Sequence, residues 1–177
     1  MKWTSKIKWF RAAGVIMCAM FIAKGVFAGA YKGFPQNHSD VYMPVSLAVD
    51  TVRTPEFSVA AELYDIVVEV EKPLPPEQMR CMMGVTLGPL DEKNCGGNDP
   101  LLQANWTVWD GKRLVDKGSA PSIRAGKFAD KHMYALLGRF TGEAGKKYVV
   151  EVKFTMDGTP LNIANPHLIV IQHSLFW

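Results

Sequence analysis

The sequence predicts an all-β fold, an antiparallel β-sandwich of about seven to nine strands that follows an N-terminal signal helix. Apolar residues recur at every second position in several short stretches, and turn signals separate these stretches. After the leader, no stretch has the apolar period of an amphipathic helix. The chain of 177 residues, 48% hydrophobic and 21% charged, suits one such domain and excludes a disordered or fibrous protein. A small closed barrel is the alternative arrangement of the strands.

The first 28 residues have the three parts of a secretory signal peptide. Basic side chains come first, a 12-residue apolar run follows from Ala12 to Ala23, and a small-residue pattern ends at Ala28. We expect cleavage after Ala28 and a periplasmic or secreted protein of bacterial type. The alternative is an uncleaved inner-membrane anchor over residues 12–30, in which Lys24 interrupts the roughly 20 apolar residues that a span needs.

The net charge of +3 comes from this leader. The first 28 residues hold five of the 20 basic residues and none of the 17 acidic ones. Cleavage would leave 15 basic and 17 acidic residues, a net charge of −2. Because nucleic-acid binding depends on neutralising phosphates, a mildly acidic body argues against a nucleic-acid partner.

Cleavage would also remove Cys18 and leave Cys81 and Cys95. Two cysteines in an exported protein predict one disulfide, which closes a loop of about 15 residues and stabilises the fold by roughly 3 kcal/mol. The alternative is a copper(I) site, because Cys81 lies in a run with Met79, Met82 and Met83. Methionine is also a common core residue, which favours the disulfide and a protein without metal or cofactor.

Residues 29–44 lack a period and predict an extended N-terminal arm, and residues 45–177 are assigned to the sandwich. Alternation changes parity near Leu63-Tyr64, which predicts a β-bulge or a strand that passes between the two sheets. Prolines end this stretch after Lys72. Residues 118–131 are less regular and are the place left for a short helix. Alternating stretches predict strands near residues 45–49, 57–70, 83–87, 104–109, 112–117, 133–140, 148–154 and 167–174.

Asp110-Gly111 separates two alternating stretches and predicts a β-hairpin with a two-residue type I′ turn. In this register Trp109 faces Lys112. The strand face with Trp106 is the more apolar one, so we expect Trp106 in the core and Trp109 outside, partly covered by the Lys112 stem. A surface tryptophan either stabilises its hairpin or contacts a partner, and Trp109 with Lys112 is the predicted partner contact.

The run from Gly145 to Val152, GKKYVVEV, resembles the Gly-x-x-Tyr-x-Val start of a late strand in immunoglobulin-like sandwiches. A final strand from Pro166 to Ile171 follows, as it does in those folds. The family's Cys–Trp–Cys core is absent, because Cys81 and Cys95 are too close in sequence to bridge two sheets in that way. The layout is also similar to that of small exported bacterial β-sandwich proteins of unknown function, some of which are immunity or accessory proteins. The resemblance implies a fold and no functional residue.

No hydrolase motif of the Gly-x-Ser-x-Gly, Ser-x-x-Lys or His-Glu-x-x-His type is present, and no catalytic residue is predicted. His167 and His173 would lie about 20 Å apart on one strand, too far for one metal ion. We interpret His132 with Asp130 as a solvated loop pair. The carboxylates of Asp65 and Glu69 could be paired as in a glycosidase, but we interpret them as solvated groups.

These observations favour an exported, non-catalytic binding protein whose partner is another envelope or secreted protein, in an immunity-like or accessory role. The alternatives are an envelope hydrolase or carbohydrate-active domain and a periplasmic copper chaperone. A deep pocket with converging carboxylates would favour the enzyme, and clustered Met, Cys and His side chains would favour the chaperone. A flat patch or an exposed strand edge would favour the binding protein.

Overall fold

A computed structural model describes residues 39–60, 62–85, 95, 100–120, 125–129 and 131–173. The predicted signal peptide and most of the predicted arm lie outside these ranges. Within them, no helix has both the length and the apolar character that a membrane span requires. The described residues belong to one compact unit of residues 31–177.

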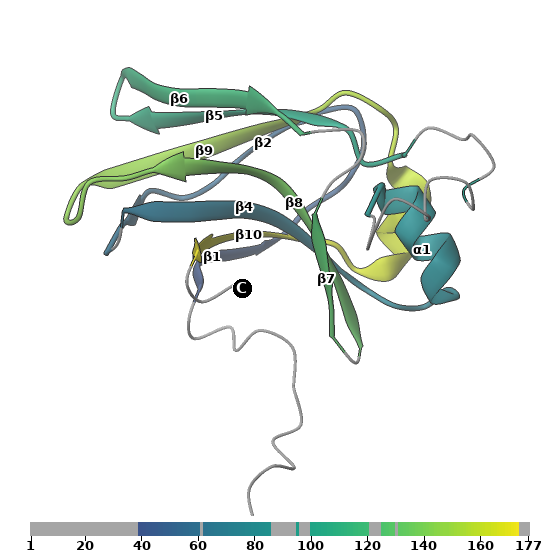
Figure 1. Cartoon of the computed structure of the whole chain (residues 1–177). Coiled ribbons are helices and arrows are strands. Elements are labelled where there is room, and N and C mark those ends of the chain that lie inside the picture. The colour runs from purple at the N-terminus through teal and green to yellow at the C-terminus, as the bar shows by residue number, and fades with distance from the viewer. Residues whose placement is uncertain are drawn as a thin grey trace, which may run out of the picture. The chain divides into compact units, whose positions relative to one another are not determined.

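Two antiparallel sheets form a sandwich, which confirms the predicted fold class (Figure 1). Sheet A has the strand order β1-β10-β4-β8-β7, and sheet B has the order β2-β9-β5-β6, with β3 also pairing with β9. Helix α1 lies at one end of the strands (Figure 1). The strands are β1 (Ser39–Pro44), β2 (Thr51–Arg53), β3 (Phe57–Ser58), β4 (Leu63–Glu71), β5 (Ala104–Asp110), β6 (Arg113–Ser119), β7 (Gly126–Phe128), β8 (His132–Thr141), β9 (Lys147–Phe154) and β10 (His167–Gln172), and the helices are α1 (Pro76–Met83) and the 3-10 helix η3 (Thr159–Ala164).

The chain crosses from one sheet to the other between β3 and β4. Strand β3 pairs with β9 of sheet B, whereas β4 pairs with β8 and β10 of sheet A. The hydroxyl of Tyr64 accepts a hydrogen bond of 2.8 Å from the amide of Ala60, which holds the crossing segment against the start of β4. The parity change near Leu63-Tyr64 therefore marks a passage between sheets, one of the two predicted explanations.

A helix replaces the beginning of the strand that was predicted over residues 83–87. Pro76 lies in the first turn of α1, where its fixed φ suits a helix start. Gly84 ends the helix with a φ of 67°, and its amide donates to the carbonyl of Cys81 at 3.1 Å. Met79 and Met83, four residues apart, are both fully buried on one helix face. Val85 forms a single β-bridge after the helix, and residues 86–87 of the predicted strand lie outside the described residues.

Other boundaries also differ from the prediction. Ser39–Pro44, within the predicted arm, form β1 and pair with β10. The strand predicted over residues 45–49 does not form, although Val45 and Leu47 are buried. In the segment where a short helix was expected, the described residues form the end of β6 and the strand β7.

The predicted disulfide joins Cys81 in α1 to Cys95, with Cα atoms 5.3 Å apart. It links the helix to a position 14 residues later in the chain. A structural disulfide of this kind indicates an oxidising compartment. The bonded Cys81 sulfur is not a free thiolate that could bind copper(I).

Trp106 connects the two sheets, and its indole packs against two glycines. It is 7% exposed, as predicted for a core residue. A Cβ atom on Gly138 of β8 would lie 2.2 Å from Trp106 Nε1, and one on Gly118 of β6 would lie 2.5 Å from Trp106 Cζ2. Both distances are far below van der Waals contact, so the ring fits only because these positions carry no side chain. The indole N–H has no hydrogen-bond partner among the described residues, so close packing holds the ring.

We expect Gly138→Ala to lower the free energy of unfolding by about 1–3 kcal/mol, because the added methyl group overlaps the Trp106 indole. In a Trp106→Ala background, Gly138→Ala should lower the free energy of unfolding by much less, because the ring that the methyl group would overlap is absent. Urea unfolding of the four proteins in this double-mutant cycle measures both costs. An equal cost in the two backgrounds would show that Gly138 is constrained by something other than Trp106.

Candidate functional site

Two carboxylates are buried on the outward face of sheet A. Asp65 is 0% exposed and Glu69 is 3% exposed, so the interpretation of both as solvated groups is wrong. The reason is their position on β4, the central strand of sheet A, where Val67 lies between them and packs with Ile169 and Tyr134 of the neighbouring strands. Strand β4 is therefore buried on both faces.

Asp65 is held by two basic groups from distant parts of the chain. Arg139 Nε donates to Asp65 Oδ1 at 2.7 Å, and His173 Nδ1 lies 2.8 Å from Asp65 Oδ2. A buried carboxylate needs such partners, because an uncompensated charge in the interior is strongly destabilising. The Asp65 cluster thus has a structural role.

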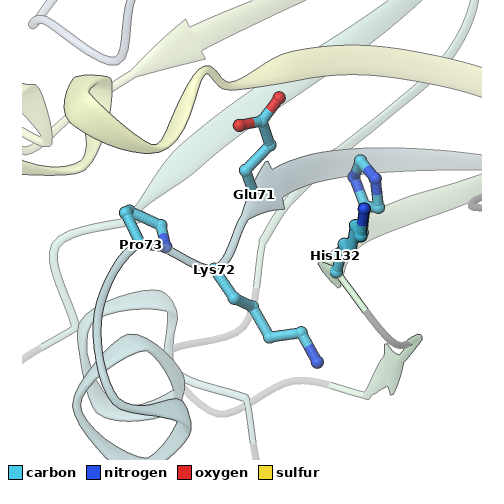
Figure 2. Close-up of a pocket in the computed structure, with 5 residues that line it drawn as sticks. Glu71, Lys72, Pro73 and His132 are labelled. Carbon is cyan, nitrogen blue, oxygen red and sulfur yellow. The ribbon is translucent and has the colours of Figure 1, made fainter.

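A polar hollow of about 510 Å³ lies where β4 ends and β8 begins (Figure 2). Glu71 and His132 are register partners on these two strands. Lys72 Nζ donates to the carbonyl of Ala129, and Glu71 Oε1 accepts a 3.1 Å hydrogen bond from Asn165 Nδ2. The hollow is lined by Glu71, Lys72, Pro73, Lys131 and His132.

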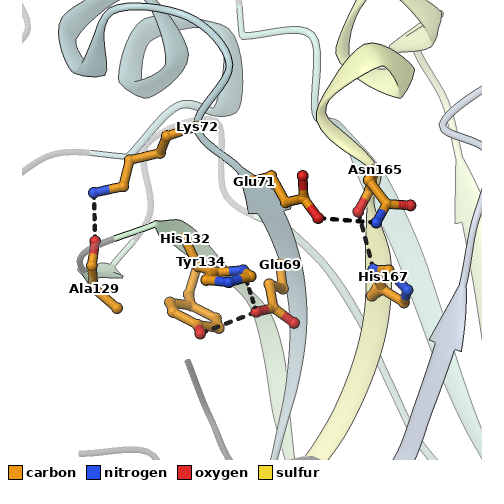
Figure 3. Close-up of polar contacts among 8 residues, drawn as sticks. All are labelled: Glu69, Glu71, Lys72, Ala129, His132, Tyr134, Asn165 and His167. Carbon is orange, nitrogen blue, oxygen red and sulfur yellow. Dashed lines mark hydrogen bonds and ion pairs between the residues drawn. The ribbon is translucent and has the colours of Figure 1, made fainter. Parts of the chain in front are cut away.

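His132 connects this hollow to buried Glu69 (Figure 3). Its Nδ1 lies 2.7 Å from Glu69 Oε1, and the Tyr134 hydroxyl donates to the same oxygen at 3.0 Å. The second carboxylate oxygen of Glu69 is buried and has no hydrogen-bond partner in the described part of the chain. The predicted partner of His132, Asp130, lies outside the described residues. Glu69 could not be recognised as the partner of His132 from local patterns, because the two residues are 63 positions apart in the sequence. The Tyr134–Glu69 contact spans 65 positions.

A histidine beside a carboxylate is one part of an acid–base site. The five residues that line the hollow include no hydroxyl or thiol nucleophile. Asp65 and Glu69 are four residues apart on an extended strand, a separation of about 13 Å. Glycosidase carboxylates lie roughly 5–9.5 Å apart, so these two do not form such a pair.

The remaining histidines do not gather at one place. His167 stacks on Tyr42 with ring centroids 4.5 Å apart, and its Nδ1 lies 2.9 Å from the Asn165 carbonyl. His173, at the other end of β10, contacts Asp65 instead. Among the described residues, no group of three or more His, Cys, Asp and Glu side chains could hold a metal ion.

The predicted hairpin forms from β5 and β6, but the predicted pairing of Trp109 with Lys112 is wrong. Asp110 pairs with Arg113, so the turn residues are Gly111 and Lys112. Gly111 has a φ of 58°, and Lys112 is not among the residues with positive φ. A type I′ turn needs positive φ at both positions, whereas glycine at the first position is the pattern of type II′. The turn therefore lies one residue later in the chain than predicted.

A β-bulge further along the hairpin changes which residue of β6 lies opposite Trp106. Trp109 is opposite Leu114, as the turn requires, and the register then shifts between Trp109 and Val108, so that Trp106 is opposite Gly118. Trp106 consequently lies in the core next to a residue without a side chain. Trp109 lies on the outward face of sheet B and is half-buried, as expected for a residue outside the core.

The outward face of sheet B around Trp109, which we call the Trp109 face, is an apolar row between polar rows. Val149, Trp109 and Leu114 lie next to one another on β9, β5 and β6, and Leu114 is 43% exposed. The indole N–H of Trp109 donates to Thr107 Oγ1 at 3.1 Å, which fixes the orientation of the ring. Strand β6 is the last strand of sheet B, with β5 as its neighbour in the described part of the chain. This arrangement places an apolar row beside a strand edge.

No family model matches the sequence, and a search of the curated proteins finds no match. Among solved structures, the chain is similar to the crystal structure of a protein from Sulfurospirillum deleyianum, with a TM-score of 0.53 and 10% sequence identity. The match covers 75% of this chain and 96% of that chain. At this identity the likeness shows a shared fold, which agrees with the two-sheet sandwich described above.

Proposed function

We propose that the protein is an exported, non-catalytic binding protein of the bacterial envelope, in an immunity-like or accessory role. It contacts another envelope or secreted protein through the Trp109 face. The leader sequence and the Cys81–Cys95 disulfide support export, because disulfides persist in oxidising compartments. Cleavage after Ala28 would release the domain into the periplasm or the medium, whereas an anchor over residues 12–30 would keep it at the inner membrane.

The observation that carries this proposal is the orientation of Trp109. Its ring is fixed by the hydrogen bond to Thr107 and flanked by Val149 and Leu114, yet it remains partly accessible on a flat sheet face. A tryptophan that is already ordered loses little conformational entropy on binding. Tryptophan is also among the residues that contribute most to protein–protein affinity. Lys112, exposed in the adjacent turn, extends the contact.

The two alternative functions have weaker support. Among the described residues that line the hollow beside His132, Glu71 is the one carboxylate, and none carries a hydroxyl or thiol nucleophile. For the copper chaperone, Cys81 is bonded to Cys95, and Met79 and Met83 are 0% exposed in the core. A flat patch with an exposed strand edge is the arrangement that favours a binding protein.

Export predicts that the mature protein begins at Gly29. Mass spectrometry of protein purified from the periplasm or the medium measures this end directly. An intact Met1–Lys24 segment in the membrane fraction would show that the leader is an anchor.

The partner contact predicts a site-specific cross-link. A photo-reactive amino acid at Lys112, expressed in the native host, should give one discrete protein adduct, and Trp109→Ala should reduce its yield by roughly 30-fold, the effect of a hot-spot residue. Trp109→Ala should leave the melting temperature within a few degrees, because the ring lies outside the core. The matched control is the same photo-reactive residue at Lys127 of sheet A, which should give no such adduct. An adduct that is unaffected by Trp109→Ala, or none from Lys112, would contradict the proposal.

A further inference from the structure

The charges of the sandwich are divided unequally between its two sheets. The strands of sheet B and the β5–β6 turn carry six basic and three acidic residues, a net charge of +3. The strands of sheet A carry two basic and four acidic residues, a net charge of −2 with histidines neutral. The six basic residues of sheet B and its turn are Arg53, Lys112, Arg113, Lys117, Lys147 and Lys153.

Three of these cations already have acidic neighbours. Arg113 Nη2 lies 2.8 Å from Asp110, Lys147 Nζ lies 2.9 Å from Glu56, and Arg53 Nη1 lies 3.9 Å from Glu151. The other three, Lys112, Lys117 and Lys153, are exposed and have no ion pair with a described residue. The positive charges of these three lysines are therefore available to pair with an acidic group of another molecule.

The three lysines lie on the outward face of sheet B or in its turn, around the apolar row. Glu151 lies on the same face, opposite Thr107, and is 3.9 Å from Arg53. Lys117 is opposite Thr107, the residue that holds the Trp109 ring, and Lys153 is opposite Asn105 on the same face. Lys112 lies in the turn next to the apolar row. An apolar centre with a basic rim is the complement of an apolar residue surrounded by carboxylates, and such complementarity gives specificity and a fast encounter.

We propose that the partner presents an acidic protein surface, with an apolar residue at its centre, to the Trp109 face. This inference rests on the proposed function and names the chemistry of the partner. A phosphate polymer fits less well, because a phosphate backbone offers no apolar side chain to the row of Val149, Trp109 and Leu114. A second copy of this chain also fits less well, because Asp65 and Glu69 of its acidic sheet are buried and already paired.

The first test uses two short synthetic peptides, one alternating glutamate with leucine and one alternating lysine with leucine. In a nitrogen-15 NMR titration of the mature protein, the glutamate peptide should shift the Trp109 indole N–H and the amides of Lys117 and Val149, and the lysine peptide should not. High salt should weaken binding, because the charges are exposed. Equal shifts from the two peptides, shifts confined to sheet A, or no shifts up to millimolar peptide would overturn the inference.

The second test uses the cellular adduct from Lys112 and separates this inference from the proposed function. Lys117→Glu with Lys153→Glu should lower the adduct yield by roughly tenfold or more, whereas the control Lys127→Glu on sheet A should leave it unchanged. If Trp109→Ala removes the adduct but charge reversal does not, the binding function stands and the acidic partner is excluded. An adduct between two copies of this chain would also overturn the inference.

Discussion

The packing of the Trp106 indole between Gly118 and Gly138 is the constraint on which both the core and the surface of this sandwich depend. Gly118 comes from sheet B and Gly138 from sheet A, so one side chain joins the two sheets. Each glycine lies near a β-bulge, one in the β5–β6 pair and one in the β4–β8 pair. The turn of the same hairpin pairs Trp109 with Leu114, and the bulge beyond that pair places Gly118 beside Trp106. On strand β5, Trp106 therefore faces the core, and Trp109, three residues later, faces outward.

Local patterns in the sequence were sufficient for the fold class, the disulfide and the buried position of Trp106. Period-two alternation identifies strands, and two cysteines allow one pairing. The turn register was missed because Asp-Gly favours a type I′ turn, and the one-residue bulge that decides the pairing has no local signal. Helix α1 was missed because the apolar alternation after Met83 was given more weight than Pro76 and Gly84, the residues that delimit the helix.

The candidate sites could be predicted only in part, because their geometry depends on contacts between distant residues. Asp65 and Glu69 looked like solvated groups, yet their partners Arg139 and Tyr134 are 74 and 65 residues away. These contacts satisfy the two buried carboxylates within sheet A. The lysines around Trp109 have no ion pair with a described residue, and this contrast is the reason why we propose the outward face of sheet B as the contact with an external partner.

The proton NMR spectrum of the mature protein tests the packing of Trp106 most directly. The account predicts nuclear Overhauser effects from the Trp106 indole to the Hα protons of both Gly118 and Gly138, with these protons shifted upfield by the ring. It also predicts that the Trp109 indole N–H shows effects to Thr107 and none to either glycine. Effects from Trp109 to Gly118 or Gly138 in place of those from Trp106 would contradict the account, because they would exchange the core and surface positions of the two tryptophans.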